Sequence, residues 1–301
     1  MRAFRFDFPS MGCPCSLQLE AADEASAASA AARARAEVAR LDEKYSHYRD
    51  DNWLARICAG ARGDHGIEVD DETANLLDFA DALHAQSAAR FDITAGPLTR
   101  LWDLQRGRLP THEEIDDARA RVGWSRVSWV RPRLRLPLPG TRLDLGGIVK
   151  EYAADRAAQC CRDSGVMHGI VDLGGDLAVI GAHADGKPWL AGIKAPRDPR
   201  QPCATIEIAG GGLATSGDYE RALVVGGRRY SHIIDPRSGW PVEGFASVSV
   251  IAASCLVAGA AATLAMLLGI DEGGAYLREL GLPFLCVDQA GRPSGSIETL
   301  A

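Results

Sequence analysis

The chain has 301 residues, of which 47% are apolar and 24% charged, and its formal net charge is −7. These values are ordinary for a globular protein, and the length suffices for one large domain with a sizeable core. An acidic chain lacks the basic face that general binding to nucleic-acid phosphates requires, so we expect no nucleic-acid partner.

The eight cysteines do not follow a metal-binding spacing. Cys13 and Cys15 are one residue apart, Cys160 and Cys161 are adjacent, and no C-x-x-C pair argues for a zinc ribbon. Reduced thiols are typical of cytosolic proteins. Residues 1–13, MRAFRFDFPSMGC, lack the apolar core of a signal peptide, and the charge-free stretches are shorter than the roughly 20 residues of a membrane span. We therefore expect a cytoplasmic protein without a membrane anchor.

Several stretches show the apolar spacing and end signals of helices. Asp70 or Asp71 is placed to cap one of them, Thr111 with Glu114 fits a capping box, and Gly165 is a stop signal. The expected helices cover residues 24–44, 70–90, 111–123, 148–164, 255–269 and 271–280.

Short strands alternate with these helices. Paired glycines in Val225-Gly226-Gly227-Arg228 predict a tight hairpin turn, and Arg131 to Arg133 predicts another. Many short strands with hairpins and a few packing helices favour an α+β fold, a mixed and mainly antiparallel sheet in one domain over 1–301, rather than a doubly wound parallel sheet. The expected strands are 14–20, 125–130, 133–138, 168–173, 177–182, 189–194, 204–209, 221–225, 229–234, 246–252 and 283–288.

Two segments join glycines to helix ends. In FDITAGPL, 91–98, a helix ends and the chain turns through Gly96-Pro97. A turn with a purely structural role would show the same pattern. In LDLGGIVKEYAADRA, 143–157, an apolar strand end runs through Gly146-Gly147 into a helix. Backbone N–H groups at such a helix start can receive an anion, although the spacing is neither a dinucleotide fingerprint nor a P-loop, and a structural turn remains the alternative.

Two further segments carry polar turns. VDLGGDLAVIG, 171–181, predicts a hairpin whose turn is flanked by Asp172 and Asp176. In ATSGDYER, 214–221, we expect a polar turn at 216–218, and YSHIIDPRSGWPV, 230–242, places His232 beside an acidic turn. A histidine there is either a packed strand residue or a general base or phosphate ligand.

These segments, in this order, resemble the motifs of the ApbE family, the FAD:protein FMN transferases. The resemblance rests on FDITAGPL, DLGGIVKEYAAD, DLGGDL, ATSGDY and SHIIDPRSGWPV, with Ser-Met-Gly-Cys at 10–13 and SHYRDDN at 46–52 similar to two further family segments. It runs from about residue 10 to 290. It implies binding of FAD and magnesium, and transfer of FMN to a Thr or Ser of an acceptor protein with release of AMP.

The resemblance also implies the residues that contact FAD. Met11 and Tyr48 would pack on its rings, Asp144 would accept hydrogen bonds from its nucleotide part, and His232 would serve as an acid–base or phosphate-stabilising group. The other implied contacts are Thr94, Ala95, Gly96, Lys150, Ser216, Gly217, Asp218 and Ile233.

Metal binding is where the sequence departs from the family. The resemblance implies a cation held near Gly147 and Thr263 with help from an aspartate, but Gly259 stands at the aspartate's position. Magnesium usually takes at least one carboxylate, so we expect a weakened site that Gly259→Asp would strengthen, unless Asp172 or Asp176 reaches the ion instead.

Three functions remain open from the sequence. The first is FMN transfer to a protein hydroxyl, the second is flavin binding without transfer, and the third is hydrolysis of FAD. The acceptor protein, the oligomeric state and the roles of Cys13 and Cys255 are not set by the sequence.

Overall fold

The framework of the molecule is one eight-stranded sheet in which all neighbouring strands are antiparallel. The computed structural model describes residues 1–102, 107–219 and 222–299. In sheet order the strands are β1 (Arg2–Ser10), β2 (Cys13–Ala21), β6 (His168–Leu173), β7 (Asp176–Gly181), β10 (Gly212–Gly217), β15 (Phe245–Ala252), β16 (Phe284–Asp288) and β17 (Pro293–Gly295).

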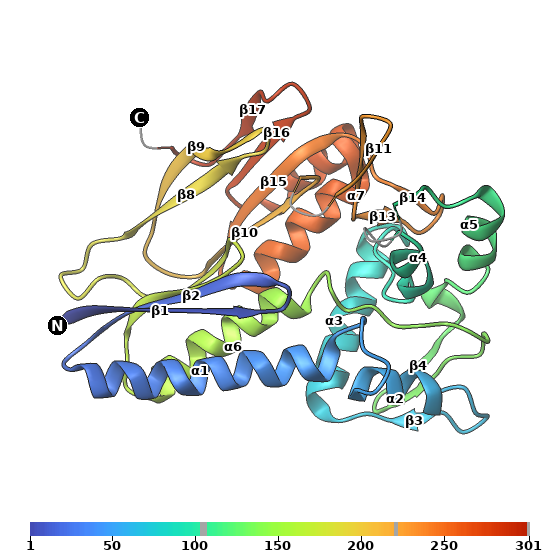
Figure 1. Cartoon of the computed structure of the whole chain (residues 1–301), viewed down its shortest axis with the longest axis horizontal. Coiled ribbons are helices and arrows are strands. Elements are labelled where there is room, and N and C mark those ends of the chain that lie inside the picture. The colour runs from blue at the N-terminus through green and yellow to red at the C-terminus, as the bar shows by residue number, and fades with distance from the viewer. Residues whose placement is uncertain (103–106, 220–221, 300–301) are drawn as a thin grey trace.

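Three long helices, α1 (Glu24–Tyr45), α6 (Val149–Asp163) and α7 (Cys255–Leu280), pack against this sheet and form the main core with it (Figure 1). The helices α1 and α6 lie side by side, and both bury alanines at helical spacing. Small side chains let helix backbones approach closely, which suits the contact between these two helices.

A ribbon of β8 (Trp189–Ala195) and β9 (Asp198–Ile208) forms a second core with the sheet. Side chains along β8 are alternately buried and exposed, as expected of a strand with one covered face. Trp189 and Ile193 pack with Ile170 of β6 and Leu213 of β10.

The remaining elements gather at one side of the molecule, at the right in Figure 1. Trp102 joins two of them, because its Nε1 donates a 2.8 Å hydrogen bond to the carbonyl of Gly239. These elements are α2 (Trp53–Gly60), α3 (Asp71–Gln86), α4 (Gly96–Leu101), α5 (His112–Arg119), a 3₁₀ turn (Trp124–Arg126), the sheet β3 (Ile67–Glu68), β5 (Arg133–Arg135) and β4 (Ser128–Val130), and the hairpins β11 (Ala222–Val225) with β12 (Arg228–Ser231) and β13 (Ile234–Asp235) with β14 (Trp240–Pro241).

Helix α7 begins with a charge-free run, residues 255–269. It is long and apolar enough to cross a membrane by composition, but 56% of its apolar window is buried inside the protein, against β10 and β15 among others. The helix is interrupted at Gly269, where φ is 80°, and it ends at Gly281 in the left-handed conformation. Its first half is therefore a core element of this fold.

The structure confirms the predicted α+β class and many local signals. Asp70 caps α3, Thr111 and Glu114 form the capping box of α5, and Gly165 follows α6 with φ of 83°. Both predicted hairpin turns, at 131–133 and 225–228, join paired strands. The predicted start of a strand at 221 lies outside the described residues.

Several predictions are wrong. Ser216-Gly217 is not a turn but the end of β10, because pairing with β15 extends the strand through Gly217. Gly96-Pro97 begins α4 instead of leaving a helix, with proline in the first turn, where its missing N–H costs nothing. Residues 143–146 form no strand, and β1 and α2 were not expected.

Candidate functional site

One end of the main sheet collects three of the segments singled out in the sequence. The β1–β2 turn and the Gly174-Gly175 turn between β6 and β7 touch there, since the N–H of Gly174 donates to the carbonyl of Pro14 at 3.0 Å. Strand β10 runs antiparallel to β7 and so reaches the same end at Gly217. The antiparallel topology thus brings residues from distant parts of the chain to one end of the sheet.

The start of α6 lies close to α7 and β10 near this end of the sheet. The space at Gly147 is narrow, because a Cβ added there would lie 3.2 Å from the ring of Phe91 and 3.9 Å from the methyl group of Thr263. The hydroxyl of Thr263 is 2.9 Å from that of Ser216. The structure therefore brings together Gly147, Ser216 and Thr263, three of the residues predicted to line the site.

Charged side chains follow on the first turn of α6. The ammonium group of Lys150 forms a close ion pair with Asp176 and lies 3.8 Å from Oε1 of Glu151. The other oxygen of Asp176 accepts the N–H of Thr215 at 3.0 Å. Both carboxylates are buried, while the Lys150 side chain is 27% exposed. Lys150 thus presents a positive charge where a phosphate could reach it.

Asp144 precedes the glycine pair and is held by His47. Its Oδ1 lies 3.0 Å from Nδ1 of His47 and accepts the N–H of Gly146 at 2.8 Å. Burial opposes ionisation of this carboxyl, but the charge of His47 and these hydrogen bonds outweigh it and lower the pKa of Asp144 to about 2. Asp144 is accordingly an ionised acceptor near neutral pH.

Met11 and Tyr48, predicted to pack on flavin rings, both lie near the end of α1. The N–H of Met11 donates to Asp42 at 2.7 Å, and its φ of 51° is unusual for a residue other than glycine. Tyr48 is 63% exposed, with its ring centroid 3.9 Å from that of His47. An exposed aromatic ring and a half-buried methionine near the same helix end suit stacking against a planar ligand.

The FDITAGPL segment is tied into the protein. Thr94 is fully buried, and its hydroxyl donates to Asp92 at 2.5 Å and accepts the N–H of Gly123 at 2.7 Å. The Thr94 hydroxyl therefore helps to hold this segment in place, and the contact of Thr94 with FAD stays a prediction. Ala95 and Gly96 begin α4 and are buried against Arg142, to which Ala95 forms an isolated bridge.

Asp218, a predicted contact of FAD, already has partners within the protein. Its carboxylate accepts hydrogen bonds from both terminal nitrogens of Arg197, at 2.8 and 2.9 Å, and from Gln289 at 2.8 Å. The side chain thus joins the β8–β9 ribbon to the turn after β16. Gly217 beside it is packed against Tyr219.

His232 and Ile233 lie between β12 and β13. His232 is exposed, so it is not the packed strand residue that was the alternative. Ile233 uses its backbone within the protein, because its N–H donates to Ser231 and its carbonyl accepts from Val242 at 2.9 Å.

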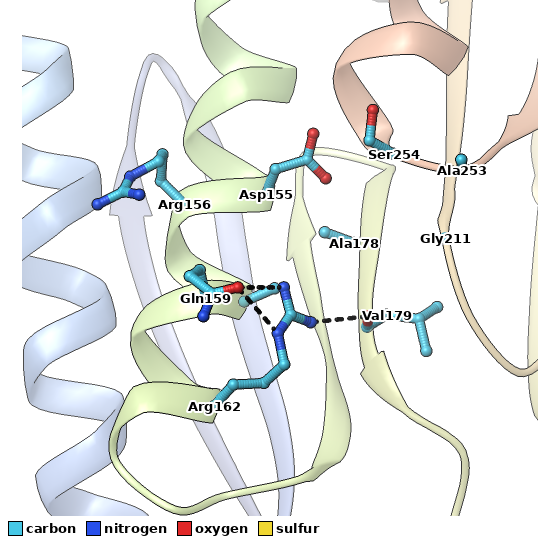
Figure 2. Close-up of a pocket in the computed structure, with 10 residues that line it drawn as sticks. Asp155, Arg156, Gln159, Arg162, Ala178, Val179, Gly211, Ala253 and Ser254 are labelled. Atoms are coloured by element: carbon cyan, nitrogen blue, oxygen red, sulfur yellow. Dashed lines mark hydrogen bonds between the residues drawn. The ribbon is translucent and has the colours of Figure 1, made fainter. Parts of the chain in front are cut away.

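A separate pocket of about 330 Å³ lies between α6, β7 and the start of α7 (Figure 2). Its charged groups already have partners. Arg162 bonds Gln159 and the carbonyl of Val179, and Asp155 accepts the N–H groups of Cys255 and Leu256, both at 2.9 Å. None of the predicted site residues lines this pocket, so it is not the candidate site.

Sequence reasoning missed three residues that shape the site. His47 stands beside Tyr48 in a recognised segment, Glu151 lies inside another, and Arg197 comes from a ribbon without a motif. The first two were visible as charged residues within quoted motifs. The partner of Asp218 could not be found from the sequence, because the ribbon folds back onto the sheet only in three dimensions.

Comparison with known proteins gives a consistent result. A family model described as the ApbE family matches residues 11–286. The FAD:protein FMN transferase of Klebsiella pneumoniae is 30% identical over 295 residues, 95% of this chain and 84% of that protein. The one from Escherichia coli is 31% identical over 260 residues, 83% of this chain and 74% of that protein.

Solved structures agree with this result. The ApbE protein from Thermotoga maritima superposes with a TM-score of 0.89 at 30% identity, covering 98% of this chain and 97% of that one. The Pseudomonas stutzeri flavinyl transferase ApbE, in its apo form, gives a TM-score of 0.85 at 32% identity, covering 98% and 95%. The chain therefore belongs to the ApbE family of FAD:protein FMN transferases.

Proposed function

We propose that this flavin transferase moves FMN from FAD to a Thr or Ser hydroxyl of an acceptor protein, releases AMP, and uses a magnesium ion. The observation that carries the proposal is the convergence of Gly147, Ser216 and Thr263 beside the Lys150–Asp176 pair. A glycine-lined helix start, the two hydroxyl groups and the ammonium group of Lys150 together suit the binding of a pyrophosphate.

The reaction is a displacement at phosphorus. The acceptor hydroxyl forms a new P–O bond to the FMN phosphate, the bond from that phosphorus to the bridging oxygen breaks, and AMP leaves with the bridging oxygen. The hydroxyl proton needs an acceptor, and exposed His232 is the group that we assign to it. Lys150 offsets negative charge on the phosphates, and ionised Asp144 orients the nucleotide part by accepting its hydrogen bonds.

The residues present fit a magnesium ion. Among the described residues no group of three or more His, Cys, Asp and Glu gathers as a metal cage. Magnesium does not need one, because it commonly takes one or two carboxylates together with substrate phosphates and waters. The carbonyl of Gly147 and the hydroxyl of Thr263 would hold it, and the ion would neutralise charge developing on the pyrophosphate.

The cellular setting is part of the same proposal. All eight cysteines are free thiols, which supports a reducing, cytoplasmic location. The partners that we propose are FAD and an acceptor protein, without nucleic acid.

The test measures both products. Purified protein is incubated with FAD, magnesium and a library of peptides that contain Thr and Ser, and AMP is measured by chromatography. We expect AMP in equal amount to FMN bound covalently to peptide, and none with a chelator present. AMP matched by free FMN would instead show an FAD pyrophosphatase, and flavin binding without AMP would show a protein that lacks transfer activity.

A further inference from the structure

The contact between α6 and α7 contains a carboxylate, that of Glu151, that takes no part in the reaction as proposed for this site. Glu151 lies in the first turn of α6 with its side chain only 8% exposed. Within the described residues its Oε2 atom is buried without a hydrogen-bond partner. A buried carboxylate oxygen without a partner is costly, so it points to a ligand that supplies one.

Gly259 of α7 makes room for this side chain. A Cβ added at Gly259 would lie 2.4 Å from Cγ of Glu151 and 2.9 Å from its Cδ. Glu151 therefore fills the volume that any side chain at position 259 would occupy. Glycine inside a helix costs about 1 kcal/mol relative to alanine, and here the missing Cβ is what admits the carboxylate.

The same contact holds the other oxygen donors. Thr263 follows Gly259 by one helical turn on the same face of α7. Gly147 lies in the turn just before α6, four residues ahead of Glu151 in the first turn of that helix. The Thr263 methyl group lies beside Gly147, and its hydroxyl bonds Ser216. Carboxylate, hydroxyl and backbone carbonyl groups are the hard oxygen donors that magnesium and manganese take.

We propose that Glu151 supplies the carboxylate ligand of a divalent cation at the contact of Gly147 with Thr263. The carboxylate expected from α7 at position 259 thus comes from α6 in this chain. The inference rests on the proposed function, because the cation is the one that accompanies FAD.

Two earlier expectations change as a result. Asp176 is not the substitute ligand, because Lys150 and the N–H of Thr215 already bind its two oxygens. Gly259→Asp alone does not strengthen the site, because the new side chain would collide with Glu151. That variant is expected to unfold at a lower temperature and to bind the cation no better.

The experiment is a manganese titration followed by electron paramagnetic resonance, with FAD present throughout. Glu151→Gln keeps the shape of the side chain and removes its charge. The exchange variant Glu151→Gly with Gly259→Asp returns the carboxylate to α7. Asp163→Asn removes one charge from the exposed end of α6, about 18 Å along the helix from Glu151, and serves as the matched control.

We expect Glu151→Gln to weaken manganese binding at least tenfold, roughly the effect of losing one ligand or its support, and Asp163→Asn to leave it unchanged. The exchange variant should bind within about threefold of the wild type, a change worth less than 1 kcal/mol. Wild-type affinity in Glu151→Gln, no manganese binding by the wild type, or a folded exchange variant that binds no better than Glu151→Gln would each overturn the proposal. If the exchange variant does not fold, Glu151→Gln decides alone.

The outcome is independent of the transfer assay. Loss of manganese binding in Glu151→Gln supports the ligand role even if the wild type transfers no FMN. Conversely, magnesium-dependent transfer by the wild type together with unchanged manganese binding in Glu151→Gln would leave the function standing and remove Glu151 from the site.

Discussion

Two groups of polar residues in this molecule differ in how completely their hydrogen bonds are made. In the first, which we call the closed cluster, Asp92 accepts hydrogen bonds from the N–H and hydroxyl of Thr94 and from the N–H of Trp124. In the second, the open cluster of Lys150, Glu151, Ser216 and Thr263, one buried carboxylate oxygen has no partner among the described residues.

The difference separates scaffold from site. Both clusters lie in segments that resemble family motifs, so motif membership alone does not distinguish them. A closed cluster has little bonding capacity left for a ligand, and its role is to hold the chain in place. An open cluster keeps a hydrogen-bond acceptor without a partner, and natural proteins rarely leave such an acceptor unused in their interior.

His232 is a proposed site residue like the members of the open cluster, and replacing it should cause the largest loss of activity. His232→Ala should reduce FMN transfer by about 100-fold or more, because a positioned acid–base group contributes about that much. The melting temperature should not change, since His232 is exposed. Steady-state AMP release measures the effect, with the exposed His65→Ala as control. Wild-type turnover in His232→Ala would remove this residue from the mechanism.

Breaking the closed cluster should cost stability. Asp92→Ala deletes three hydrogen bonds to a buried carboxylate, so the free energy of unfolding should fall by on the order of 3 kcal/mol. Urea unfolding followed by tryptophan fluorescence measures it, with the exposed Asp51→Ala as control. An unchanged midpoint would show that this carboxylate does not hold the segment.

Asp144 shares one property with each cluster. Its carboxylate accepts hydrogen bonds within the protein, and it is also predicted to bind the nucleotide part of FAD. Its pKa of about 2 lies below the ordinary value of about 3.9, so its ionised form stabilises the folded protein above pH 4. We expect Asp144→Asn to lose roughly 2 kcal/mol at pH 6, and the difference from the wild type to shrink as pH falls from about 4 towards 2. Urea unfolding across this range tests it, and a difference independent of pH would contradict the assignment.

Replacing Thr263 should have the smallest effect, and it tests whether the hydroxyl group in the open cluster binds the cation. Thr263→Val keeps the shape but loses the hydroxyl bonded to Ser216, so manganese affinity with FAD should fall about fivefold, near 1 kcal/mol. Thr263→Ser should retain most of the affinity. Calorimetry distinguishes them, and equal affinities for the valine and serine variants would show that the hydroxyl is not a ligand.

Local signals in the sequence predicted much of the fold. The capping box at Thr111, the stop at Gly165 and the glycine pair at Gly226-Gly227 depend on neighbours within a few residues, so they could be recognised directly. The end of β10 could not, because Ser216 and Gly217 look like a turn until β15 pairs with them.

The candidate site shows the same limit. Gly147, Ser216 and Thr263 were identified by resemblance, and the structure places them together. The sequence also revealed that a carboxylate is missing at Gly259. It could not reveal that Glu151, 108 positions earlier, fills the vacated space, because that follows only from how α6 packs on α7.

The most direct test of the whole account is the position of the cation in a crystal soaked with FAD and manganese, located by its anomalous scattering. We predict a peak at the contact of α6 with α7, coordinated by the carboxylate of Glu151, the hydroxyl of Thr263, the carbonyl of Gly147 and the FAD phosphates. A peak held only by phosphates and waters away from Glu151, or one at another place in the fold, would contradict it.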